Sequence, residues 1–66
     1  MREKRAAIQP VAELLSYKVR AGEFTMEESD KVFRLTADKY EKAGAIMDIL
    51  EMDLPAADTI LKIERL

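Results

Sequence analysis

At 66 residues, with 48% hydrophobic and 36% charged residues, the chain is long enough for one small folded domain but too short to bury a large core. Cysteine and histidine are absent, which excludes disulfides, thiol and imidazole catalysis, and every strong metal ligand except carboxylates. Two glycines and two prolines supply too few turns for an all-β fold. We therefore expect a single all-α domain that gains stability from a second copy or a partner.

The net charge of −2 is unevenly distributed along the chain. Residues 1–22 carry five basic and two acidic groups, whereas residues 23–43 sum to −2 and residues 44–66 to −3. One interpretation is that the ends of the chain attract each other when the helices fold back antiparallel. The other is that the basic segment binds an acidic partner.

The first residues, Met1 to Arg5, are charged like the start of a signal peptide, but Gln9, Pro10 and Glu13 interrupt any apolar stretch. No run approaches the roughly 18 apolar residues of a membrane span. We therefore expect a cytoplasmic protein without a signal peptide and without a membrane partner.

The first helix is expected over residues 9–21, because Val11, Leu15 and Val19 recur at a spacing of four on one face. Pro10 suits the first turn of a helix, where its missing N–H has no partner to lose. A helix already running from Glu3 would be kinked there. Residues 1–7 are therefore expected to form either a separate turn or a loose basic arm.

A break follows at residues 21–25. Gly22 can take the left-handed conformation that ends a helix, and Thr25 can cap the next one. The sequence Thr25-Met26-Glu27-Glu28 fits a capping box, in which the Glu28 side chain reaches back to the Thr25 amide. A second helix is therefore predicted to start at Met26.

From Met26 onward, large apolar or aromatic residues recur every seven positions, at Met26, Phe33, Tyr40, Met47 and Leu54. We call this set the heptad column. The matching second heptad positions are Ser29, Thr36, Ala43 and Leu50. The phase continues through Gly44 and predicts one helix over residues 26–53, about 40 Å long. The alternative is a break at Gly44, because an interior glycine costs about 1 kcal/mol relative to alanine.

A last helix is expected over residues 55–66, where Ala56, Ile60 and Ile63 contribute to a broad apolar face. Asp53 is a candidate cap, and Pro55 suits the first turn. The fold predicted from the sequence is thus an antiparallel helical hairpin with a long second helix and a short C-terminal helix.

Candidate catalytic and metal-binding groups are few. Carboxylate pairs occur at expected helix ends, at Glu27–Glu28 and Glu51–Asp53, where the helix dipole or a cap accounts for them. Gly22 and Gly44 stand alone and build no phosphate-binding loop. We predict a protein that is not an enzyme and has no metal, cofactor or small-molecule substrate.

Nucleic-acid binding is the alternative function. Residues 46–66 imitate a helix-turn-helix, but in the supposed recognition helix Asp58 and Glu64 offset Lys62 and Arg65. A basic N-terminal segment would be the better contact surface. The candidate nucleic-acid contacts are Arg2, Lys4, Arg5, Lys18 and Arg20.

The favoured function is binding of another protein through an apolar helical face, as in a small regulator, inhibitor, assembly chaperone or adaptor. A first helix of about 20 Å cannot cover a second of about 40 Å, so part of the heptad column is left for a second copy or a partner helix. We expect a homodimer that also binds another protein. The predicted contact residues are Phe33, Tyr40, Ile46, Met47 and Leu50.

Overall fold

The computed structural model describes the backbone of residues 2–66 and the side chains of residues 5–66. This part of the chain contains helices and no strand, which confirms the all-α fold class. It forms four α-helices and one short 3-10 helix: α1 (Arg2–Arg20), α2 (Met26–Asp38), η1 (Tyr40–Lys42), α3 (Ala43–Leu50) and α4 (Ala56–Glu64).

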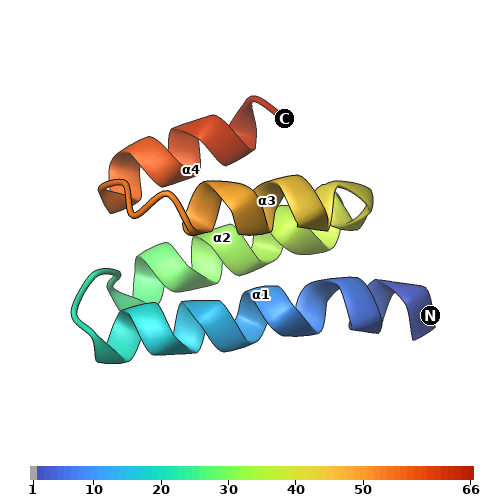
Figure 1. Cartoon of the computed structure of the whole chain (residues 1–66), viewed down its shortest axis with the longest axis horizontal. Helices are drawn as coiled ribbons and strands as arrows, with labels where there is room; N and C mark the ends of the chain where they lie inside the picture. The colour runs from blue at the N-terminus through green and yellow to red at the C-terminus, as the bar shows by residue number, and fades with distance from the viewer. Residues whose placement is uncertain (1) are drawn as a thin grey trace.

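The α-helices alternate in direction along the chain, as Figure 1 shows. α1 packs against α2 and α3, and α4 packs against the same two helices. The expected three-helix arrangement is therefore replaced by four helices, with the turn after α1 and the loop before α4 at the same end of the bundle (Figure 1).

α1 is longer than the sequence indicated and includes Pro10 in its interior. Residues 2–7 belong to this helix. They therefore form neither the separate turn nor the loose basic arm that was expected from the sequence. Pro10 cannot donate to the carbonyl of Ala6, one turn earlier. Both residues are exposed, so water can satisfy this carbonyl and the helix continues.

The predicted break and capping box are confirmed. Gly22 has φ +78°, and the amides of Gly22 and Glu23 donate to the carbonyls of Val19 and Lys18, which closes the end of α1. The Glu28 amide donates to Thr25 Oγ1 over 3.1 Å, and the Thr25 amide donates to Glu28 Oε1 over 2.9 Å. Two of the amide groups at the start of α2 are thereby satisfied.

The predicted long second helix is wrong. It is divided at Lys39, which has φ −119° and ψ 41°, and Gly44 lies inside α3, so the alternative break at Gly44 is not found either. Thr36 Oγ1 donates to the Val32 carbonyl over 2.8 Å, a local bond that competes with helix geometry. Thr36 and Asp38 are also weak helix formers.

The division also brings two lysines to the C-terminal end of α4. Lys39 Nζ donates to the carbonyls of Ile63, over 3.1 Å, and Glu64, over 2.9 Å. Lys42 Nζ donates to the Leu66 carbonyl. Carbonyls at a helix C-terminus lack intrahelical partners, and cations interact favourably with them. These bonds between distant parts of the chain favour the break over a straight helix.

The core contains buried apolar residues from every α-helix and from the turn after α1: Val11, Leu15, Phe24, Val32, Ala43, Ile46, Leu50 and Ile63. The heptad column contributes none of them, since Met26 and Phe33 are exposed and the other three members are half-buried. The small second positions Thr36 and Ala43 are buried instead. The break after α2 resets the helical phase, so a column drawn through both helices does not mark one face.

α4 begins one residue later than predicted, with Pro55 at the N-cap position and no side-chain cap. Asp53 is therefore not a cap, which corrects the sequence prediction. It lies in the loop after α3 and adopts the left-handed conformation, with φ 56°.

Candidate functional site

An open groove runs between α1 and α2. A hollow of about 410 Å³ lies along Ala12, Ser16 and Phe33, and a second of about 450 Å³ adjoins it at Val19 and Arg20. Ser16, Met26 and Ser29 line both hollows, so the two form one continuous surface. No residue of α3 or α4 lines either hollow. We call this surface the α1–α2 groove.

Two large apolar side chains stand on the α2 side of the groove. Met26 is 73% exposed and Phe33 is 39% exposed. They are two helical turns apart and share a face because seven residues nearly complete two turns. The core side of α2 is formed instead by Val32 and Thr36, both fully buried.

Small side chains form much of the remaining lining. Ala12 and Ser16 lie on α1, one turn apart, and Ser29 lies opposite them on α2. Small residues on facing helices leave a depression that the side chains of another helix can enter. The groove therefore combines two projecting apolar side chains with a low floor.

The groove has charges of opposite sign on its two sides. Arg20 lies at the end of α1, whereas Glu27 and Asp30 lie in the first turns of α2. Asp30 Oδ2 pairs with Arg34, 3.1 Å away on the same helix. Within the described side chains, neither Arg20 nor Glu27 forms an ion pair. Both charges face solvent and are available to a second molecule.

The lining of the groove is described by its openness and by the chemical groups that it contains. Its volume would admit a small ligand, but such pockets enclose the ligand and present converging polar groups, whereas this groove is open and largely apolar. Among the described side chains, no group of three or more carboxylates could hold a metal ion. In the same part of the chain, Ser16 and Ser29 form no side-chain hydrogen bond to a basic group that could activate them.

The predicted contact residues do not form one surface. Phe33 lies in the groove, whereas Ile46 and Leu50 are 0% and 1% exposed in the core and offer no atoms to a partner in this conformation. Tyr40 and Met47 are half-buried and lie outside the groove lining. Met26 was not one of the five predicted contact residues, although its place in the heptad column and the adaptability of methionine made it suited to an uncovered apolar groove.

The candidate nucleic-acid contacts are likewise separated. Lys18 is 3% exposed and offers almost no surface to a nucleic acid in this conformation. Arg5 and Arg20 are exposed, and the side chains of Arg2 and Lys4 lie outside the described residues. In the supposed recognition helix, now α4, Thr59 and Ile63 are buried against the rest of the bundle.

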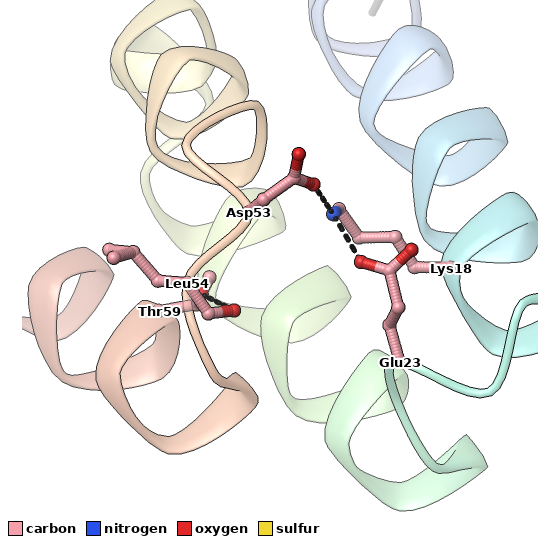
Figure 2. Close-up of polar contacts among 5 residues, drawn as sticks. All are labelled: Lys18, Glu23, Asp53, Leu54 and Thr59. Atoms are coloured by element: carbon pink, nitrogen blue, oxygen red, sulfur yellow. Dashed lines mark hydrogen bonds and ion pairs between the residues drawn. The ribbon is translucent and has the colours of Figure 1, made fainter.

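Lys18 joins three parts of the chain at one end of the bundle. Its Nζ lies 3.2 Å from Glu23 Oε1 in the α1–α2 turn and 3.3 Å from Asp53 Oδ1 in the loop before α4. Figure 2 shows the lysine between the two carboxylates. The Phe24 ring centroid is 5.8 Å from the same nitrogen. Both ion-pair partners satisfy the buried ammonium, so the arrangement is one of structural support.

No family model, curated protein or solved structure matches this chain significantly. None of the helices in the described part of the chain is both long and apolar enough to cross a membrane. The functional proposal therefore depends on the surface itself.

Proposed function

We propose that this protein is a non-enzymatic, cytoplasmic interaction module that binds protein through the α1–α2 groove. The observation that carries the proposal is the exposure of Met26 and Phe33 side by side on one face, above a floor of small residues. Regulator, inhibitor, assembly chaperone and adaptor are the functional classes that such a surface serves.

The physical argument is the gain from covering these two side chains. Complete burial of a methionine or phenylalanine side chain stabilises by roughly 1.5–3 kcal/mol, and part of that gain is still available at Met26 and Phe33. Phenylalanine supplies a rigid aromatic surface, and methionine adapts to an irregular one. An amphipathic helix placed along the groove would cover both.

Other exposed apolar residues are a weaker basis for a docking surface. Tyr17, Met52 and Leu61 are 59%, 55% and 46% exposed, but none of them lines the α1–α2 groove. Tyr17 is on the same helix as Ala12 and Ser16 and points to a different side. Single exposed apolar residues are normal on protein surfaces.

Site-specific photo-crosslinking in cells tests the proposal. A photoreactive amino acid would replace Met26 in the groove and, in a matched control, Tyr17 outside it. We expect a defined crosslinked protein species from position 26, either a dimer of this chain or an adduct with another protein. The species should disappear when Phe33→Asp is introduced into the same chain.

Two controls make the result specific. Circular dichroism should show that Phe33→Asp remains helical, which we expect because Phe33 lies outside the core cluster. Crosslinks of equal yield and identity from positions 26 and 17, or a position-26 crosslink that persists with Phe33→Asp, would contradict the proposed site.

A further inference from the structure

We infer that the occupant of the α1–α2 groove is a second copy of this chain, related by a twofold axis that runs parallel to α1 and α2. This inference rests on the proposed function and names the partner of the same site. It is argued from the position of charge along the groove, from the match of side chains at equal heights, and from the small size of the chain.

The first argument is charge. Arg20 ends α1 and Glu27 begins α2, and the turn over residues 21–25 joins them, so both lie at the same end of the groove. A twofold axis parallel to the helices preserves height along the groove and places α1 of each copy opposite α2 of the other. Arg20 of each copy then faces Glu27 of the other. The interface contains this contact twice.

The other simple twofold arrangement is less favourable. An axis that crosses the helices would stack α1 on α1 and α2 on α2. This axis also reverses height along the groove, so Arg20 of one copy would no longer face Glu27 of the other. Asp30, near the middle of the α2 side of the groove, would instead approach Asp30 of the second copy, and like charges brought together across an interface oppose association.

The second argument is shape. The turn over residues 21–25 joins the two helices, so Ala12, eight residues before the end of α1, and Phe33, seven residues after the start of α2, lie at about the same height in one hollow. By the same count, Met26 lies at about the height of Val19 in the adjoining hollow. The parallel axis keeps these heights. Phe33 of each copy therefore meets the small Ala12 of the other, and Met26 meets Val19. Large side chains opposite small ones are what close helix packing requires.

The third argument is stability. A chain of 66 residues buries only about 60% of the surface that its unfolded form exposes. A chain of this size has few other ways to gain stability, since it has no cysteine and its described side chains form no metal cluster. Pairing two α1–α2 faces would bury additional apolar surface, which includes Met26 and Phe33.

Sedimentation equilibrium on the purified protein, with charge-reversed variants, tests the inference. We expect the native chain to be a dimer at micromolar to millimolar concentrations. Arg20→Glu places glutamate opposite Glu27 twice, and Glu27→Arg places arginine opposite Arg20 twice, so each variant alone should dissociate roughly tenfold more readily. The control, Lys62→Glu on the exposed part of α4, should dimerise like the native chain.

The decisive sample is an equimolar mixture of the two variants. In a mixed dimer, one contact pairs the two substituted side chains, glutamate with arginine, and the other pairs the native Arg20 with the native Glu27. The mixture should therefore associate as tightly as the native chain. Phe33→Asp should abolish the dimer. Mixed variants that associate no better than either alone would overturn the twofold arrangement, as would a dimer that Phe33→Asp leaves intact.

If the native chain stays monomeric up to millimolar concentration, the inference that a second copy occupies the α1–α2 groove is wrong. The proposed function would then stand if position 26 crosslinks to a different protein in cells and Phe33→Asp removes that crosslink. It would fail together with the inference if no crosslink from position 26 depended on Phe33.

Discussion

Lys18 Nζ lies 3.3 Å from Asp53 Oδ1 and joins residues that are 35 positions apart in the chain. The lysine side chain is 4% exposed and the aspartate side chain 79% exposed, so the ion pair joins a buried cation to a carboxylate at the surface. It fixes the loop between α3 and α4 to the end of α1 (Figure 2). Within the described side chains, it is the one ion pair between the basic first third of the chain and the acidic last third.

Asp53→Asn should lower the free energy of unfolding by about 0.5–1 kcal/mol at low salt, because it removes the charge of a largely exposed partner. Asparagine tolerates the left-handed conformation at this position, so the backbone contributes little to the change. Urea denaturation in low salt and in 1 M NaCl measures the effect, which should shrink at high salt. Asp48→Asn, at an exposed position of α3, is the control. An equal loss at both salt concentrations would indicate a cause other than charge.

Thr25→Ala should destabilise the protein by about 1 kcal/mol, because the Glu28 amide loses its acceptor at the start of α2. Thr25→Ser keeps a hydroxyl and should lose much less. Thermal unfolding followed by circular dichroism compares the two variants. If alanine and serine were equally destabilising, the hydroxyl would not be the stabilising group.

Leu50→Ala should cost about 2–5 kcal/mol, because Leu50 is 1% exposed and its truncation leaves a cavity in the core. A domain of this length is stable by roughly 3–10 kcal/mol in total, so a large part of the variant should be unfolded at 37 °C. Met52→Ala, two residues later and 55% exposed, should be nearly neutral. Chemical denaturation of both variants measures the difference, and similar costs at both positions would contradict the placement of Leu50.

Lys39→Met should destabilise the end of α4, because the Ile63 and Glu64 carbonyls lose a charged donor. We expect a loss of about 1–2 kcal/mol, since hydrogen bonds to charged groups are stronger than neutral ones and this site is partly exposed. Amide hydrogen exchange should accelerate in the last turn of α4. Lys62→Met removes an exposed lysine within α4 and should leave that exchange almost unchanged.

Local signals in the sequence correctly predicted the turn after α1 and the start of α2. Gly22 and the Thr25 capping box act within a few residues, so their geometry depends little on the rest of the chain. The division of the second helix at Lys39 could not be predicted from local sequence signals. It is favoured by contacts with Ile63 and Glu64, which are 24 and 25 positions away in the chain.

The error over the second helix also explains the mixed outcome for the candidate site. In one straight helix, Phe33 and Leu50 would have followed a single helical repeat and would have lain on the same apolar face. Because α3 is a separate helix with its own direction, Phe33 lies at the surface while Ile46 and Leu50 lie in the core. Lys18 could not be recognised as buried, because its partner Asp53 is brought to it only by the folding of α3 and α4.

The docking role of the α1–α2 groove is tested most directly by the solvent accessibility of two methionine methyl groups. With methionine methyls ¹³C-labelled, a soluble paramagnetic agent should broaden Met26 and Met52 alike in dilute protein, since both are more than half exposed. As the protein associates with itself or with its partner, Met26 should become protected while Met52 remains broadened. Association that protects Met52 and leaves Met26 accessible would contradict the proposed groove.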